Sequence, residues 1–319
     1  MVTVTDDKST PGASPVEPPP IADKAPTRGR MVLRRFLRRK AAVFGLAVVV
    51  LLYLMAFLGP LISPWGYAEP DYTAFLQPPS AEHWFGTTKI GEDVFAQVMR
   101  GLQKSLTIGL LVGVVSTGVA ALVGALAGYF GGWIDRSLMW VVDLLLVLPS
   151  FLIIAVLSPA FKGESWLLFV VLLAGFSWMI TARIVRGMTL TLREREYVKA
   201  ARFMGQSPLR IIFKHIVPNM ASLLIIDATI TIGAAVLSET GLSFFGFGVQ
   251  PPDVSLGTLI ASGTESALTY PWLFYIPAGF LVLFVLAVNL FGDGLRDALD
   301  PSSTRARKRD KDDSEEDER

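Results

Sequence analysis

Residues 41–62 read AAVFGLAVVVLLYLMAFLGPLI, an apolar run without one charged side chain. A helix of about 20 apolar residues crosses the hydrocarbon core of a bilayer. Inside lipid the segment has to be helical, because a helix satisfies its backbone N–H and C=O groups internally. The run is too long for a secretory signal, and no small-residue cleavage pattern follows it. It therefore predicts a helix that stays in the membrane.

Five further apolar stretches follow this one. The predicted spans are roughly 41–62, 104–128, 138–158, 165–184, 219–240 and 272–292. The composition agrees: 52% of the 319 residues are hydrophobic and 18% are charged, against about 25% charged in a typical soluble domain. The predicted fold class is all-α, a polytopic transmembrane helical bundle of about six spans.

The regions outside the spans suggest a division of the chain. Residues 1–30 are polar and proline-rich, which is typical of a disordered tail. We expect residues 31–103 to hold the first span and an outer loop, and residues 104–293 to form the core of the bundle. Residues 294–319 form a charged tail whose basic part precedes an acidic part. We expect this tail to be disordered, with a contact between its basic part and anionic lipid as the alternative.

The basic side chains predict the orientation. Residues 28–40 carry seven Lys or Arg and residues 183–218 carry eight, whereas the loop 241–271 carries none. Basic residues concentrate on the cytoplasmic side of a membrane protein. With six spans, both termini and segment 183–218 fall on that side. We therefore expect a multi-pass protein of the cytoplasmic (plasma) membrane with both termini in the cytoplasm.

Small residues and prolines within the spans suggest how the helices pack. Gly109 and Gly113, and likewise Gly124 and Gly128, are four residues apart, a spacing that lets two helices approach closely. Pro149 and Pro277 should kink the third and sixth spans.

Three acidic residues lie within predicted spans. A carboxylate in lipid is costly, so Asp143 and Asp227 should face the bundle or a cavity. They could line a pathway; a helix–helix hydrogen bond or a wet helix end is the structural alternative, which we favour. Glu239, at the outer end of the fifth span, could belong to an outer gate or be a solvated helix end.

The composition also excludes several classes of site. The chain has no cysteine, which removes disulfides, thiolate metal sites and a thiol nucleophile. Only two histidines are present, His83 and His215, and we expect no metal site and no catalytic residue. A net charge of +1 gives no electrostatic support to nucleic-acid binding. The nucleotide-binding pattern Gly-x4-Gly-Lys-Ser/Thr is also missing from the sequence.

The polar segment between the fourth and fifth spans has the sequence pattern of two short helices joined by a turn. Residues 194–219 read EREYVKAARFMGQSPLRIIFKHIVPN. Residues 193–204 favour a helix that ends at Gly205 in a left-handed cap. Ser207 and Pro208 then suit the N-cap and first position of a second helix reaching about residue 217, whose predicted apolar face is Leu209, Ile212, Phe213 and Ile216.

This helix-turn-helix could act as a lever for a soluble motor, with the small pair Ala200 and Ala201 leaving room for a partner surface. It could equally lie on the lipid headgroups as an amphipathic surface helix. The residue pattern alone leaves both readings open.

A resemblance separates the two readings. Segment 196–219 resembles the coupling motif of ATP-binding cassette (ABC) importer permeases, in which Glu-Ala-Ala is followed by a glycine and later a proline. The fuller pattern Glu-Tyr-Val-x-Ala-Ala…Gly…His-Ile-x-Pro-Asn resembles the dipeptide, oligopeptide and nickel branch. The coupling residues that this implies are Glu196, Tyr197, Ala200, Ala201, Gly205, Ser207, His215 and Pro218.

Two further stretches resemble the same branch. Residues 83–101 resemble the segment before the second span, although the usual Gly-Arg-Asp-Val is here Gly-Glu-Asp-Val at residues 91–94. Residues 238–252, SETGLSFFGFGVQPP, resemble the signature at the end of the fifth span. The resemblance covers about residues 30–300 and is strongest to the second, C-type permease of the pair.

The resemblance implies a type I ABC importer permease fold and a transport subunit that is not itself an enzyme. The implied partners are a homologous second permease, one or two P-loop ATPases, an extracytoplasmic substrate-binding protein that docks on the outer loop 241–265, and membrane lipid. ATP and Mg would be bound by the partner ATPase, with no cofactor on this chain. Di- or oligopeptides are the expected substrate, with nickel or another small solute as the alternative.

A carrier driven by an ion gradient is the competing class. It would need inverted repeats or broken helices at mid-membrane, and it leaves segment 194–218 without a role. A membrane enzyme is the third reading, for which the sequence shows no cluster of catalytic groups.

Overall fold

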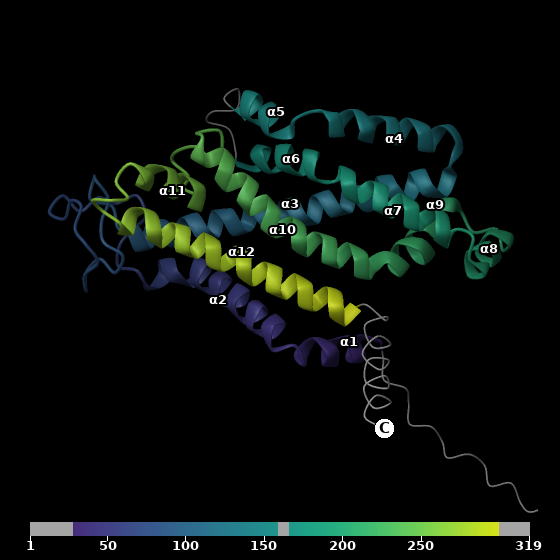
Figure 1. Cartoon of the computed structure of the whole chain (residues 1–319), viewed down its shortest axis with the longest axis horizontal. Helices are drawn as coiled ribbons and strands as arrows, with labels where there is room; N and C mark the ends of the chain where they lie inside the picture. The colour runs from purple at the N-terminus through teal and green to yellow at the C-terminus, as the bar shows by residue number, and fades with distance from the viewer. Residues whose placement is uncertain (1–27, 159–165, 300–319) are drawn as a thin grey trace, which may run out of the picture.

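The computed structural model describes residues 28–158 and 166–299, which form an elongated helical bundle (Figure 1). The helices are α1 (Arg28–Leu37), α2 (Lys40–Ile62), α3 (Val94–Phe130), α4 (Gly132–Val147), α5 (Ser150–Leu157), α6 (Trp166–Ser177), α7 (Met179–Leu192), α8 (Glu196–Phe203), α9 (Pro208–Ile211), α10 (Ala221–Phe244), α11 (Leu256–Thr264) and α12 (Trp272–Leu299). These described ranges contain isolated β-bridges but no strand. The all-α prediction is confirmed.

The number of spans also agrees with the prediction. Four helical stretches are long and apolar enough to cross a membrane: Lys40–Ile62, Val94–Phe130, Pro208–Phe244 and Trp272–Leu299. The pairs α4–α5 and α6–α7 are each bent, by 77° and 47°. If each bent pair is one span, the described residues hold six.

Several helices continue past the predicted spans. Helix α3 begins at Val94, inside the predicted outer loop, where the Asp93 carboxylate caps it by accepting the Ala96 N–H at 2.7 Å. Helix α7 reaches Leu192 and α12 reaches Leu299, beyond the predicted ends at 184 and 292. The first helical residue of the N-terminal region is Arg28, and residues 1–27 and 300–319 lie outside the described part of the chain.

The two prolines behave differently. Pro149 stands between α4 and α5 at the 77° bend, so the predicted kink is confirmed there. Pro277 lies inside α12, which continues as one helix on both sides of it. The bend between α6 and α7 falls at Trp178 and was not predicted. There Trp178 Nε1 donates to the carbonyl of Gly175 at 2.9 Å, and Ser177 Oγ donates to that of Leu173 at 2.7 Å.

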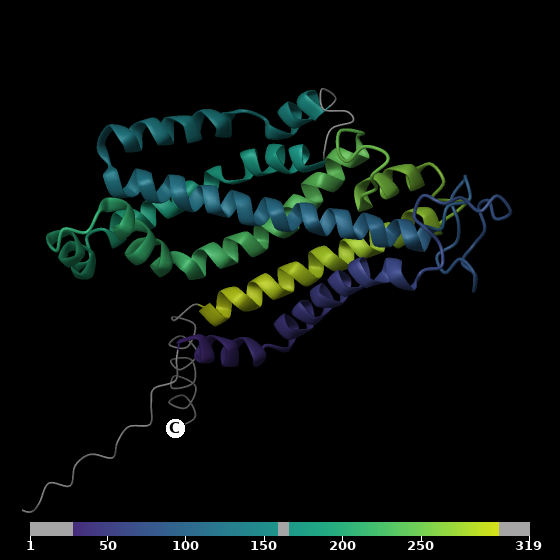
Figure 2. The same ribbon diagram turned by 180° about the vertical axis from the view of Figure 1, so that it is seen from behind.

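Helix α3 is the central packing element. It runs along the bundle beside α10 and α7 (Figures 1 and 2). A Cβ placed on Gly109 would lie 2.6 Å from Val236 Cγ2 of α10. A Cβ on Gly124 would lie 2.4 Å from the Ala182 carbonyl oxygen of α7. The glycine pairs therefore serve close helix contact, as predicted, and each pair serves a different neighbour.

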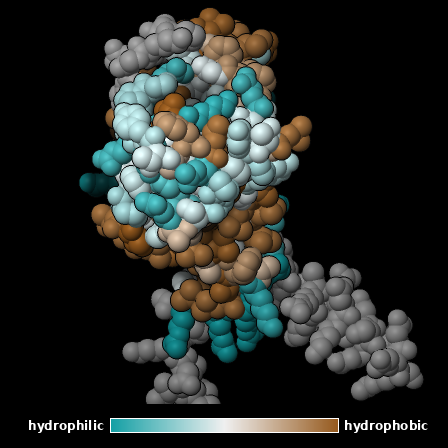
Figure 3. All heavy atoms as spheres, turned by 90° about the vertical axis from the view of Figure 1, so that its left-hand side faces the viewer, coloured by the Kyte–Doolittle hydropathy of each residue, from teal (hydrophilic) through white to brown (hydrophobic). Residues whose placement is uncertain are grey.

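The two ends of the bundle differ in chemistry. The loop end, defined here by residues 63–93 and α11, gathers hydrophilic residues, with hydrophobic residues around them (Figure 3). The opposite end carries α8 and α9 and is called the elbow end (Figure 1). Apolar side chains such as Phe44, Val114 and Leu283 are exposed on the length between the ends, as expected for helices surrounded by lipid.

Candidate coupling elbow and buried polar groups

The elbow, defined here as residues 194–219, connects α7 with α10. Its first helix is α8, and α9 begins five residues after α8 ends. The predicted regular second helix was wrong in detail: α9 has four residues, a π turn at Ile212–Ile216 follows, and a 3₁₀ turn at Val217–Met220 leads into α10. Pro218 has no N–H for a regular helical ladder, which accounts for a change of winding at this place.

The turn between α8 and α9 follows the predicted chemistry. Gly205 has φ of +75°, and its N–H donates to the Arg202 carbonyl at 3.0 Å. The N–H of Gln206 donates to the Ala201 carbonyl at 3.1 Å, which completes a Schellman cap. Ser207 has the extended backbone of an N-cap before Pro208, but its hydroxyl makes no capping bond. The left-handed cap at Gly205 is confirmed, and the cap at Ser207 is confirmed for the backbone only.

The buried face of the elbow is only partly the one predicted: Ile212 and Ile216 are buried as expected, but Leu209 and Phe213 are not. Ile211, Ile212 and Ile216 are fully buried, whereas the exposed fractions of Leu209 and Phe213 are 54% and 56%. The π turn explains the error, because its wider winding brings Ile211 and Ile216, five residues apart, to one face. The buried residues pack with Ala125 and Tyr129 of α3 and Val185 of α7.

The pair Ala200 and Ala201 is also divided between two roles. Ala201 is buried in the same cluster as the isoleucines, while Ala200 is exposed. Ala201 therefore packs inside the elbow and only Ala200 lies on its surface, and the coupling role of the pair stays a prediction.

Polar contacts tie the elbow to the end of α3. Arg193 Nη1 donates to the Gly128 carbonyl at 3.0 Å, where a cation is favoured by the helix dipole. The Arg202 guanidinium lies 5.5 Å from the centre of the Tyr129 ring. Within the elbow, Lys199 Nζ lies 3.2 Å from Glu194 Oε2, and this hydrogen bond is the main reason why the pKa of Glu194 is lowered.

The remaining predicted coupling residues lie on or near the surface of the elbow. Glu196, Tyr197 and Pro218 are exposed. His215 is half-buried, and its Nε2 lies 3.1 Å from Gln206 Oε1. The elbow thus brings the predicted residues into one compact unit.

An apolar patch on the elbow was missed by the sequence analysis. Phe203 and Met204 are 89% and 72% exposed, and with Leu209, Phe213 and Tyr197 they form what we call the elbow patch. The signal was available: Phe203 and Met204 are large apolar residues directly before a turn glycine. Exposed apolar patches on an otherwise polar surface mark interaction sites.

Asp227 joins three helices. Its carboxylate accepts hydrogen bonds from Thr117 of α3 at 2.8 Å and from Thr181 of α7 at 2.6 Å. These contacts support the helix–helix hydrogen bond that we favoured for this residue.

Asp143 of α4 has a different surrounding. It forms an ion pair with Arg183 of α7, and both side chains are more than half exposed. A second pair links the same helices, since Arg186 Nη2 donates to Asp135 Oδ2 at 2.6 Å. Sequence reasoning singled out Asp143 but missed that α4 and α7 are joined by two such pairs.

Glu239 is completely buried, so the solvated helix end was a wrong alternative. Its carboxylate accepts hydrogen bonds from Ser105 Oγ at 3.0 Å and Ser243 Oγ at 2.6 Å. The same hydroxyls accept the N–H groups of Leu256 at 3.2 Å and Val249 at 3.3 Å. Glu239 therefore holds the segment 245–256 at the loop end through two serines; its part in a gate stays a prediction.

Ion pairs lie beside this network. Lys104 Nζ lies 3.0 Å from Asp253 Oδ2 and 4.4 Å from the centre of the Trp166 ring. Arg100 reaches the other oxygen of Asp253 at 3.4 Å. Lys104 is nearly buried, so this contact fixes segment 245–256 to α3 a second time.

A buried histidine organises the loop before α3. His83 Nδ1 lies 2.9 Å from Asp93 Oδ2, and its Nε2 lies 3.4 Å from Asp71 Oδ2. Hydrogen bonds from Thr73, and then the contact with His83, lower the pKa of Asp71. Across residues 28–158 and 166–299, no group of three His, Asp or Glu side chains is placed to hold a metal ion.

Comparison with known proteins agrees with this arrangement. The family described as "Binding-protein-dependent transport system inner membrane component" matches residues 120–305, and the "N-terminal TM domain of oligopeptide transport permease C" matches residues 27–79.

Several relatives match along most of their length. The oligopeptide transport system permease protein OppC of Mycobacterium tuberculosis (strain ATCC 25618 / H37Rv) is 58% identical over 88% of this chain and 97% of its own. The protein of the same name in Bacillus subtilis (strain 168) is 36% identical over 88% and 92%. A putative peptide permease protein of Brucella suis biovar 1 (strain 1330) is 40% identical over 84% and 89%.

These matches confirm the resemblance to ABC importer permeases and the type I permease fold. They also place the chain among multi-pass inner-membrane transport subunits rather than enzymes. Because the first family covers more than half of the chain and the relatives cover most of it, the chain belongs to the family of binding-protein-dependent transport system inner membrane components.

Proposed function

We propose that this chain is one of two permease subunits of an ATP-driven oligopeptide importer and that its elbow receives an ATPase subunit. The substrate class is supported by the names of the relatives, which are oligopeptide or peptide permeases. Nickel complexes or another small solute are the alternative substrates. The observation that carries the coupling role is the exposed elbow patch on a rigidly anchored elbow.

The elbow is suited to transmit force. Its exposed side carries Phe203, Met204 and Phe213, and its buried side packs on α3 and α7. It continues through Pro218 directly into α10. A partner that pushes on the elbow patch would therefore move α7, α10 and α3 together, because interlocked side chains do not slide freely past each other.

The nucleotide belongs to the partner in this proposal. The chain supplies no P-loop, so ATP and Mg would sit on one or two separate ATPases that bind the elbow end from the cytoplasm. The basic residues of 183–218 support this orientation, which puts both termini in the cytoplasm. The chain's own residues provide the docking surface and the rigid connection to the spans.

The loop end would face the substrate-binding protein. Segment 245–256 is held in place by Glu239 through Ser105 and Ser243, so it offers a preformed surface. A homologous second permease would complete the pathway between the two bundles. ATP-driven closure would then shift a two-state bundle between inward and outward access.

An ion-driven carrier is the second candidate, and the bent pairs α4–α5 and α6–α7 are the observation that favours it. Broken helices in such carriers place ion-coordinating groups at the break. Here the break between α4 and α5 is Leu148–Pro149, and the other is Trp178, none of which has a charged side chain. The elbow patch would also have no role.

The test is co-purification of the tagged full-length chain in mild detergent, with mass spectrometry of its partners. We expect a second permease and one or two P-loop ATPases, and Phe203→Asp should lose the ATPases while keeping the second permease. Leu268→Asp is the matched control, since Leu268 is 97% exposed at the loop end, and it should keep the ATPases. A wild-type chain that purifies alone would instead support the carrier.

A further inference from the structure

An apolar groove lies between α1, α10 and α12, apart from the elbow patch and the loop end. Its volume is about 530 Å³. The walls include Val32 and Phe36 of α1, Ala221 and Ile225 of α10, and Phe291 and Leu295 of α12. None of the residues that line it is charged.

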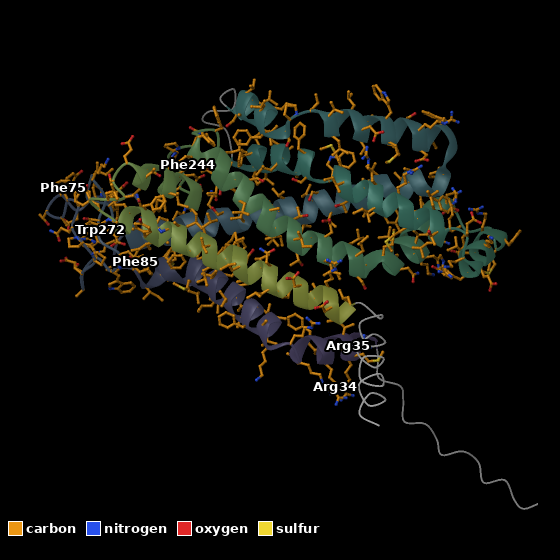
Figure 4. The ribbon with its side chains drawn as sticks, viewed as in Figure 1. Arg34, Arg35, Phe75, Phe85, Phe244 and Trp272 are labelled. Atoms are coloured by element: carbon orange, nitrogen blue, oxygen red, sulfur yellow. The ribbon has the colours of Figure 1, made fainter. Side chains whose placement is uncertain are left out.

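Helix α1 is amphipathic and turns its apolar side to this groove. Val32, Leu33 and Phe36 line the groove, and their spacing of three to four residues places them on one helix face. Arg30, Arg34 and Arg35 are exposed on the rest of the helix. Figure 4 shows Arg34 and Arg35 pointing away from the bundle. The groove is therefore bordered by cations that do not enter it.

These arginines have no acidic partner in the part of the chain that the structure describes. The neighbouring Arg39 pairs with Asp297 of α12, whereas Arg30, Arg34 and Arg35 form no ion pair with a described carboxylate. No carboxylate of residues 28–158 or 166–299 neutralises their guanidinium groups, which can therefore bind an anion from outside the chain.

The apolar groove and the exposed arginines of α1 together indicate which ligand could bind. Leu46 of α2, a helix long and apolar enough to cross a membrane, also lines the groove, so the groove lies against a segment that lipid tails surround. An uncharged groove accepts a hydrocarbon chain, and a cluster of Arg next to a span binds anionic headgroups. We propose that the groove binds one anionic phospholipid, with an acyl chain along α1 and α12 and its phosphate at Arg30, Arg34 and Arg35.

Such a lipid would also connect α1 with the elbow. Pro218, Ala221 and Ser222 line the groove, and they stand where the elbow passes into α10. The bound lipid would bridge the N-terminal helix and this junction. The assignment uses α1, α10 and α12 alone and does not depend on what the chain transports.

The test uses the full-length chain in the assembly in which it purifies, delipidated in neutral detergent. A phosphatidylglycerol with a diazirine in its acyl chain is photo-activated, and the labelled residues are mapped by mass spectrometry. We expect labels on the groove walls, and unlabelled phosphatidylglycerol should compete far better than phosphatidylcholine. Labels outside the groove, or equal competition by both lipids, would overturn the proposal.

Two kinds of variant test the charge of the arginines and the shape of the groove separately. Replacing Arg30, Arg34 and Arg35 by Gln should weaken phosphatidylglycerol binding roughly fivefold for each arginine removed, about 100-fold in total. The matched control replaces Arg136, Arg210 and Lys214, which are exposed basic residues that do not line the groove, and should bind normally. Ala221→Trp should abolish groove labelling with all arginines present.

Other occupants give a different result in the same assembly. With benzoylphenylalanine at Leu33, we expect cross-links to lipid. Cross-links to a second permease, or to another part of this chain, would show that protein fills the groove and would refute the lipid assignment. Equal loss of lipid binding in the matched control would refute the role of the three arginines.

Discussion

Gly205 shows how a single backbone angle shapes the elbow. A Cβ placed on Gly205 would meet nothing within 4 Å, so there is room for a side chain. The reason for a glycine is instead its backbone angle φ of +75°. The left-handed region costs other residues about 1–2 kcal/mol. The requirement is therefore conformational and not steric crowding, which is why it could be predicted from the motif alone.

Gly205→Ala should accordingly destabilise the turn between α8 and α9 by about 1–2 kcal/mol. The measurement is amide hydrogen exchange of residues 196–211 in the full-length protein, where faster exchange is expected. Gly205→Asn is the control, since asparagine tolerates this region better, and it should exchange more slowly than the alanine variant. Wild-type exchange in Gly205→Ala would show that the cap does not hold the turn.

For the three acidic residues within the spans, the sequence predicted that they are unusual but not which residues they contact. Asp143, Asp227 and Glu239 were recognised as unusual from their position in apolar runs. Each has a partner on another helix: Arg183 for Asp143, Thr117 and Thr181 for Asp227, and Ser105 for Glu239. Because these contacts join residues 40 to 134 positions apart, local pattern could not distinguish a buried network from a solvated end.

Among the helices, α3 packs closely against two neighbours through two separate pairs of glycines. Gly109 and Gly113 meet α10, and Gly124 and Gly128 meet α7. Gly118, between the two pairs, faces open space. These five glycines look alike in sequence, but four of the five serve packing, and Gly101 near the start of α3 is also closely packed.

This difference gives a matched pair of variants. Gly124→Ala should destabilise the protein by about 1–3 kcal/mol, because the new Cβ would clash with the Ala182 backbone. Gly118→Ala should be neutral or stabilising by up to about 1 kcal/mol, since alanine is the better helix former. Thermal unfolding in the same detergent compares them. Equal melting temperatures would contradict the close packing of α3 on α7.

The elbow shows why elements are predicted better than their faces. Its two-helix layout and its glycine turn followed from local signals. The π turn at Ile212–Ile216 did not, and it rotated the buried face from Leu209 and Phe213 to Ile211. Burial against Tyr129 of α3 and Val185 of α7 decides that rotation, and Tyr129 lies far from the elbow in sequence.

For the whole molecule, the contacts of the elbow with α3 predict that both move as one body. The chain has no cysteine, so pairs of spin labels can be introduced at chosen positions without labelling it elsewhere. Labels at Arg210 of the elbow and Gly118 of α3 should keep the same distance with and without ATP in the complete transporter. Labels at Arg210 of this chain and on the second permease should change their distance.

A change of the intramolecular distance alone would contradict a rigid elbow. It would mean that the cluster around Ile211, Ile212 and Tyr129 opens during the cycle. An unchanged distance in both pairs would speak against movement of the bundles relative to each other.

The sequence by itself determined the membrane class, the approximate number of spans, the elbow and its glycine cap, and the family. Each of these depends on local quantities: the length of an apolar run, the sum of charges in a loop, or the backbone freedom of one residue. Only the tertiary structure decided where helices end beyond the apolar runs, which face of the elbow is buried and what Asp227 and Glu239 bind. Those features depend on the free energy of contacts between distant segments, which no window of sequence contains.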